Sequence, residues 1–259
     1  MDKQTINEMT GEKDYKKAPD FKLNQVNFNG KDGKFVKLHL LEEKLENGKY
    51  KKTDLGESLD VVFLKHRRDL SSFKKVAGEN VIKQTNEHNH KDDFVTLFMG
   101  ANKESGIASD LRVRYPELKT RQIVYVYVPQ LDEVVRLFIK GSSLGSNQKE
   151  KEVMGYYEYL GSFGSDESCW QYETNLTPVQ ETSDLGDYYA ISFNRGKKLD
   201  EKEIETTMVR IEAIHNKLKD IDDYYKSKKA DVREEQVSEE PDVVDDYPTE
   251  DINPDDIPF

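Results

Sequence analysis

Between residues 21 and 193 the hydrophobic positions fall in short alternating runs, separated by Gly, Asn and Asp. This pattern is typical of β-strands joined by turns. The two strongest runs, 122–128 and 133–140, follow each other closely and predict a hairpin. A polar stretch, 71–93, interrupts the pattern, and we expect it to be a loop, with or without a short helix. The sequence therefore predicts a mainly β body with long loops.

Alternate positions of the predicted strands differ in chemistry, and side chains alternate between the two faces of a strand. One face is aliphatic, as in Val124, Val126 and Val128, and suits a core. The other face combines aromatic rings with cations. Its members are Arg121, Tyr125 and Tyr127 on one strand, Arg136, Phe138 and Lys140 on the next, and Phe35, Lys37, Phe63, Lys65 and Arg67 on two earlier strands.

An aromatic and basic sheet face suits single-stranded nucleic acid, because bases stack on the rings while Lys and Arg follow the phosphates. An OB-like barrel of five strands with long loops is a common scaffold for this task. The sequence thus favours an OB-like fold that binds DNA through these residues. The alternative is that the aromatic face packs under a second layer, with its cations at the rim.

The hydrophobic period changes after residue 200. Ile204, Ile211, Leu218 and Tyr225 recur every seven residues, with Ile214 and Ile221 between them. Asp200 followed by Glu203 resembles a capping box at a helix start. We therefore expect an amphipathic helix of about 25 residues. Its apolar stripe either packs on the body or, over three heptads, forms a coiled-coil dimer.

The charge is distributed very unevenly. Residues 231–259 hold twelve acids and one base, so they carry −11 of the net charge of −12. The other residues hold 39 acids and 38 bases, which leaves the body free to present a basic face. The acidic, Pro-containing tail predicts disorder. We divide the chain into a flexible segment (1–19), an OB-like DNA-binding domain (20–199), a helix (200–229) and a disordered acidic tail (230–259).

The tail ends on Asp255, Asp256, Ile257, Pro258 and Phe259. An apolar ring beside a terminal carboxylate, preceded by acids, makes a compact peptide ligand. The segment resembles the acidic tip of bacterial single-stranded-DNA-binding proteins. Because the body departs from the usual bacterial sequence of this family, we expect a divergent, phage-encoded member. The resemblance implies that these five residues dock into hydrophobic, basic-rimmed pockets on replication, recombination and repair proteins.

The sequence offers no credible catalytic set, metal site or cofactor motif, so we expect a protein that is not an enzyme. A single cysteine, Cys169, fits a reducing cytoplasm, and no apolar run of about 18 residues predicts a membrane span. A homo-oligomer is possible. Two alternatives stay open: a DNA-annealing or DNA-processing enzyme, or recombination accessory, that uses the same tip, and a decoy that occupies host repair factors.

Overall fold

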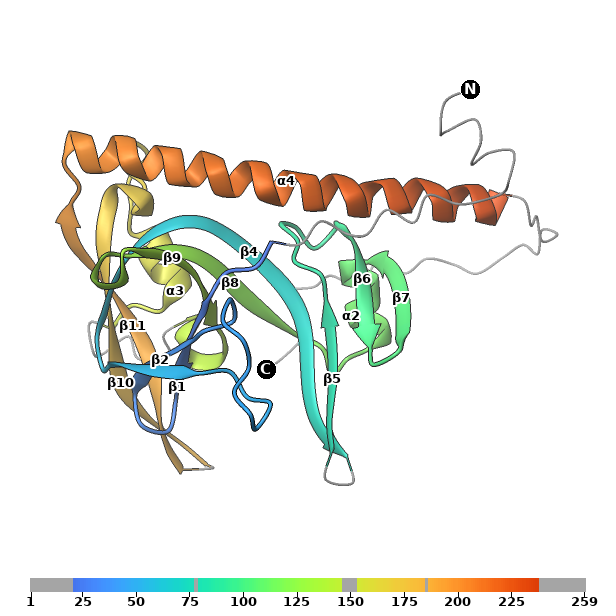
Figure 1. Cartoon of the computed structure of the whole chain (residues 1–259), viewed down its shortest axis with the longest axis horizontal. Helices are drawn as coiled ribbons and strands as arrows, with labels where there is room; N and C mark the ends of the chain where they lie inside the picture. Colours follow the sequence, from blue (N-terminus) through green and yellow to red (C-terminus); the bar gives the residue numbers. More distant parts are fainter. Residues whose placement is uncertain (1–20, 77–78, 146–152, 185, 238–259) are drawn as a thin grey trace, which may run out of the picture.

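The computed structural model describes residues 21–76, 79–145, 153–184 and 186–237, and within them β-strands predominate (Figure 1). The strands are β1 (Gln25–Asn29), β2 (Lys34–Leu38), β3 (Lys52–Gly56), β4 (Leu59–Val76), β5 (Glu79–Thr85), β6 (Phe94–Met99), β7 (Asn102–Ile107), β8 (Lys119–Val128), β9 (Glu133–Ile139), β10 (Tyr172–Ser183) and β11 (Gly186–Lys198). The helices are α2 (Ala108–Arg114), α3 (Tyr156–Gly161) and α4 (Glu201–Val237). The predicted mainly β body with a C-terminal helix is confirmed.

The strands form one eleven-stranded sheet in the order β3-β2-β1-β9-β8-β4-β5-β6-β7. The remaining two strands form a branch of this sheet, in which β10 pairs with β4 and β11 pairs with β10. Within the described residues the edge strands β3 and β7 do not pair with each other, so the sheet is not closed. The expected five-stranded OB-like barrel is not confirmed, because the sheet is larger and open.

The polar stretch 71–93 is not simply a loop. β4 continues to Val76, and β5 returns beside it, with Phe73 opposite Ile82 and Val76 opposite Glu79. The signal for this long hairpin is present in the sequence. Residues 71–76 contain no Gly or Pro, and Gly78 precedes the next hydrophobic pair. The polar composition concealed the hairpin because it lacks the alternation of hydrophobic and polar residues by which strands are recognised.

Two hydrophobic cores lie on opposite faces of β4, β8 and β9. The first core contains the aliphatic positions of β8 and β9 together with α3, and its members include Val124, Val126, Val135, Leu137, Tyr156 and Tyr159. The second core, here called the helix-covered core, contains Val62, Leu64, Ile123, Tyr125, Leu199, Ile214 and Leu218. A third cluster around Leu97, Leu111 and Leu118 joins α2 to β6.

A β-bulge in β4 decides which side chains reach which core. Phe63 lies opposite Val126 of β8, whereas Lys65 lies opposite the very next residue, Tyr125. Leu64 is therefore an extra residue on β4, and one extra residue reverses the alternation of faces beyond it. Phe63 consequently lies in the first core, while Lys65 and Arg67 lie on the opposite face with Tyr125.

Helix α4 lies along one side of the body and covers β4, β8 and β9 (Figure 1). It begins with the expected capping box, in which Glu203 N donates to Asp200 Oδ1 at 2.9 Å and Asp200 N donates to Glu203 Oε2 at 2.8 Å. Its stripe packs on the body through Ile214 and Leu218, so this alternative is the confirmed one. None of the helices in the described ranges has the length and apolar character that a membrane span requires.

Candidate nucleic-acid interface

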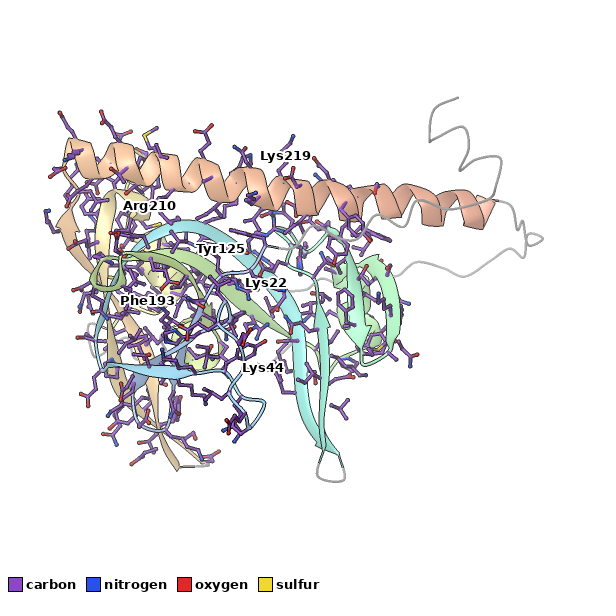
Figure 2. All side chains as sticks on the ribbon, viewed as in Figure 1. Lys22, Lys44, Tyr125, Phe193, Arg210 and Lys219 are labelled. Carbon is purple, nitrogen blue, oxygen red and sulfur yellow. The ribbon has the colours of Figure 1, made fainter. Side chains whose placement is uncertain are left out.

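The aromatic and basic residues predicted for β8 and β9 lie on one face of the sheet. In the ladder, Ile123 lies opposite Phe138, Tyr125 opposite Arg136, and Tyr127 opposite Val134. Directly opposed residues of antiparallel strands share a face. This face is the one that α4 covers, so its residues divide into a covered part and an open part. Figure 2 labels Tyr125 of the covered part and Arg210 of α4.

Tyr125 is the centre of the covered part. Its side chain is only 1% exposed, and the ring of Phe21 stacks on it at 5.9 Å with an interplanar angle of 6°. The Tyr125 hydroxyl donates to Glu87 Oε2 at 2.6 Å. Burial, reinforced by the Glu87 carboxylate, raises the pKa of this hydroxyl far above its usual range. In this conformation the Tyr125 ring has no surface available for a base.

Tyr127, two residues further along β8, lies beneath a cation from α4. The Arg210 guanidinium lies 3.6 Å from the centre of the Tyr127 ring. The Tyr127 hydroxyl donates to Asp132 Oδ1 at 2.9 Å. Because Arg210 occupies one face of the ring, Tyr127 is part of the contact between α4 and the sheet.

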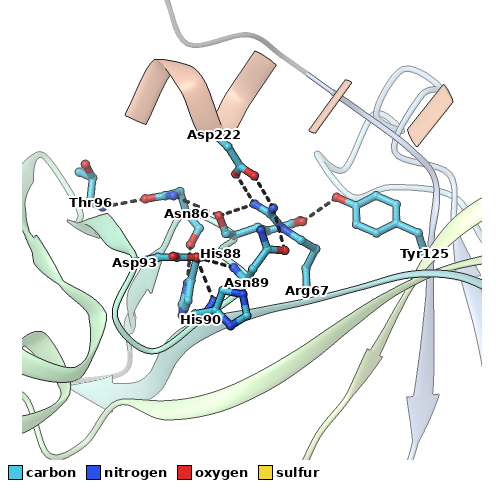
Figure 3. A network of polar contacts seen from close by, with 10 residues as sticks. Arg67, Asn86, His88, Asn89, His90, Asp93, Thr96, Tyr125 and Asp222 are labelled. Atoms are coloured by element: carbon cyan, nitrogen blue, oxygen red, sulfur yellow. Dashed lines mark hydrogen bonds and ion pairs between the residues drawn. The ribbon is translucent and has the colours of Figure 1, made fainter. Parts of the chain in front are cut away.

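Arg67 and Arg136 belong to one network of polar contacts, of which Figure 3 shows the part around Arg67, Asp222 and Tyr125. Arg67 donates to both carboxylate oxygens of Asp222 on α4, to the Glu87 carbonyl at 2.8 Å and to Asn89. Arg136 donates to Glu87 Oε1 at 3.2 Å. These two cations therefore neutralise internal acids and hold α4 and the β5–β6 loop on the sheet.

Three further residues of the predicted face lie on the other side of the sheet. Phe63 is buried in the first core because of the bulge at Leu64, and Phe35 is buried there as well. Lys37 lies opposite Val26, a residue of the same core, and forms an ion pair with Glu133. The prediction that Phe35, Lys37 and Phe63 lie on the same face as Tyr125 is thus wrong. The alternation of side chains along a strand could locate neither the bulge nor the packing of β2.

The open part of the face, which is its less covered part, lies along β8 and β9 around Phe138. This residue is half-buried at the edge of the helix-covered core. The Arg121 guanidinium lies 4.1 Å from the Phe138 ring centre and 5.8 Å from that of Phe73. Asp69 orients it through an Nε–Oδ1 bond of 3.1 Å and is itself buried, with Gln84 donating to it at 2.9 Å. Burial raises the pKa of Asp69 even though Arg121 acts in the opposite direction.

The lysines Lys119 and Lys140 are exposed, and alternation places them on the face of Arg121 and Phe138. Lys65 is half-buried on the same face, opposite Tyr125. Phe73 was not identified from the sequence because it fell in the presumed loop. It is 63% exposed. The open part of the face thus consists of the exposed Phe73, Lys119 and Lys140 beside the half-buried Arg121 and Phe138.

Two other polar clusters have different chemistry. In the β5–β6 loop, Asp93 Oδ2 accepts hydrogen bonds from the backbone N–H groups of Asn89 at 2.8 Å and His90 at 2.9 Å, which fixes the turn. No group of three or more His, Cys, Asp or Glu residues arranged to hold a metal ion occurs in the portion of the chain described above.

Cys169 and His66 form the second cluster, with Sγ and Nε2 3.6 Å apart, and His66 Nδ1 lies 2.6 Å from the Tyr156 hydroxyl. Burial lowers the pKa of His66 to about 4 and raises that of Cys169 to about 11. Both groups are neutral at neutral pH, which is the reverse of the thiolate and imidazolium of an activated cysteine.

The predicted partner-binding residues Asp255, Asp256, Ile257, Pro258 and Phe259 lie outside the described residues, as do the flexible segment 1–19 and most of the acidic tail. No protein-family model, curated protein or solved structure matches the chain. The open part of the sheet face is therefore the surface on which a functional inference rests.

Proposed function

We propose that the chain binds single-stranded DNA with the open part of its aromatic and basic face during replication, recombination or repair. The observation that carries this proposal is the Arg121 guanidinium placed against Phe138 at 4.1 Å and near the exposed ring of Phe73. Rings and planar cations together support base stacking, while nearby lysines attract phosphates. The covered residues Tyr125, Tyr127 and Arg67 instead contact α4, and Arg136 binds Glu87 of the β5–β6 loop.

Charge supports the same proposal. Outside residues 231–259 the acids and bases nearly balance, at 39 and 38, so the large negative charge belongs to the tail. Near the face, the acids Asp69 and Glu87 are already paired with Arg121 and Arg136, whereas Lys119 and Lys140 are exposed. The uncompensated charge on this face is therefore positive, as a polyanion requires.

A salt-dependent titration tests the proposal. We expect the full chain to bind a labelled oligothymidine more tightly at about 50 mM salt than at about 200 mM. The double variant Lys119→Ala/Lys140→Ala should bind several-fold more weakly, with a smaller salt slope. Lys219→Ala, an exposed lysine on α4, serves as the matched control. The absence of strand binding by the unaltered chain at low salt would overturn the proposal.

Recruitment of replication, recombination or repair proteins by Asp255, Asp256, Ile257, Pro258 and Phe259 is the second part of the proposed function. It rests on the sequence of this segment, an apolar residue pair and a ring beside paired acids. Phe259→Ala should abolish the binding of purified bacterial replication or repair proteins and leave oligothymidine affinity unchanged. Equal binding by both forms would exclude the segment as the ligand.

A further inference from the structure

The distal parts of β4 and β5 form a two-stranded arm, defined here as residues 71–76 and 79–84. Phe73 lies opposite Ile82, and Ser71 lies opposite Gln84. Only Lys83–Thr85 of β5 pair with β6, so the rest of the arm projects from the body as a hairpin (Figure 1). A lone two-stranded hairpin has little core of its own.

The arm exposes large apolar side chains toward solvent. Phe73 is 63% exposed and its cross-strand partner Ile82 is 46% exposed, so both present apolar surface on one face of the hairpin. An exposed aromatic beside an exposed aliphatic residue on a projecting element is a common feature of binding surfaces. Burial of these two side chains against a ligand would remove apolar surface from water, which is energetically favourable.

This face of the arm is continuous with the open part of the sheet face. Beyond the bulge, Arg67 lies opposite Ile123 and Asp69 opposite Arg121, and alternation carries the same face on to Ser71 and Phe73. The Arg121 guanidinium, 5.8 Å from the centre of the Phe73 ring, forms the junction. A ligand that contacts Phe138 and Arg121 therefore meets Phe73 next.

The charge of the arm identifies the class of ligand. Residues 71–84 contain three lysines, Lys74, Lys75 and Lys83, and one acid, Glu79. This net positive charge disfavours pairing with a second copy of the same arm and favours a polyanion. A single strand offers both phosphates and unstacked bases with free π-faces, whereas a duplex keeps its bases stacked.

We propose that a base of the bound single strand stacks on Phe73, with Ile82 beside it, so that the strand continues from Arg121 and Phe138 out along the β4–β5 arm. This inference rests on the proposed function and assigns it a second contact region. Because every base has a π-face, the contact should be tolerant of sequence and specific for single strands.

Affinity measurements on the full chain test the assignment. Phe73→Ala should weaken oligothymidine binding by roughly tenfold to a hundredfold, which is the usual loss for one base–aromatic stack. Its salt slope should stay unchanged, since no charge is removed, and Phe73→Tyr should restore affinity. Val113→Ala, at an 81% exposed position on α2, is the matched control and should bind like the unaltered chain.

A tryptophan reporter gives an independent readout. Oligothymidine should quench the fluorescence of Phe73→Trp beyond the change from Trp170 seen in the unaltered chain, and it should not do so for Val113→Trp. If the unaltered chain binds the strand and Phe73→Ala binds equally well, the arm is excluded while the proposed function stands. If Phe73→Ala only converts a dimer to a monomer in sedimentation, the arm binds a second copy and the inference fails. An unaltered chain that binds no single strand removes both proposals.

Discussion

Arg67 on β4 and Asp222 on α4 form a bidentate ion pair, with Nη1–Oδ2 and Nη2–Oδ1 distances of 2.8 and 2.6 Å. The Arg67 side chain is 1% exposed. Removing one partner of a buried ion pair leaves an uncompensated charge. This pair therefore fixes α4 on the sheet more firmly than an exposed pair of the same geometry.

Asp222→Ala should lower the free energy of unfolding by about 3 kcal/mol, because Arg67 would keep only the Glu87 carbonyl and Asn89 as partners. Denaturant unfolding followed by circular dichroism measures the change. Asp223→Ala, in the neighbouring exposed pair with Lys219, should change it by less than about 0.5 kcal/mol. Equal effects of the two variants would show that the buried pair does not hold the helix.

Tyr125→Phe removes the hydroxyl that donates to Glu87 Oε2 at 2.6 Å but keeps the buried ring. We expect a loss of about 1–2 kcal/mol of stability, since Glu87 is left with one fewer donor. Oligothymidine affinity should be unchanged, because the ring lies under Phe21 and α4. A large loss of affinity without a loss of stability would show that α4 leaves the sheet when a strand binds.

His66 makes the protein sensitive to acid. Burial lowers its pKa from 6.5 to about 4, with Lys65 contributing in the same direction. The unfolded chain therefore binds this proton at higher pH than the folded chain. The stability associated with neutral His66 is present above pH 6.5 and is lost as the pH falls toward 4, by about 3 kcal/mol in total.

Unfolding free energies at several pH values in this window check the His66 prediction. His66→Gln should lose much of the acid-induced destabilisation, whereas His90→Gln, at an exposed position, should retain it. The pKa of His88 is also lowered by burial, so a smaller residual slope should remain in His66→Gln. An unchanged slope in that variant would contradict the assignment.

Cys169 should react slowly with a thiol reagent in the folded protein. It is buried in the first core, and burial raises its pKa to about 11, so little thiolate forms at pH 8. Labelling with a chromogenic disulfide should become fast only in denaturant. In Val113→Cys the introduced thiol should react at once while Cys169 stays protected; simultaneous reaction of both thiols would show that the first core opens readily.

Hydrophobic pattern predicted the elements with strong local signals. The β8–β9 hairpin, the start of α4 at the Asp200–Glu203 capping box and the packing of the α4 stripe all follow from spacing and capping residues. The β4–β5 hairpin could not be predicted in this way, because its sequence is polar and lacks alternation. Sheet size and closure depend on pairings distant in sequence, such as β4 with β10, which local patterns do not encode.

The candidate site was predictable only in part. The alternation of side chains along the strands correctly placed Tyr125, Arg136 and Phe138 on one face. It could not tell that Phe21, Arg210 and Asp222 would cover much of that face. These residues are distant in sequence from the strands that they cover, and Asp222 lies 155 residues from Arg67. The bulge at Leu64 places Phe63 on the opposite face from Lys65 and Arg67. Phe73 was not predicted as a site residue, because the strand that carries it was not predicted.

β4 supplies side chains to all three hydrophobic clusters: Val61 and Phe63 to the first core, Val62 and Leu64 to the helix-covered core, and Leu70 to the third. A single unbroken strand that belongs to every cluster cannot leave one of them without disturbing the others. Exchange of its hydrogen-bonded amides should therefore occur only through global unfolding, with one common opening free energy along Val61–Leu70. The β-sheet body and its covering helix would then unfold together in one transition, and proteolysis should yield no stable fragment that lacks either.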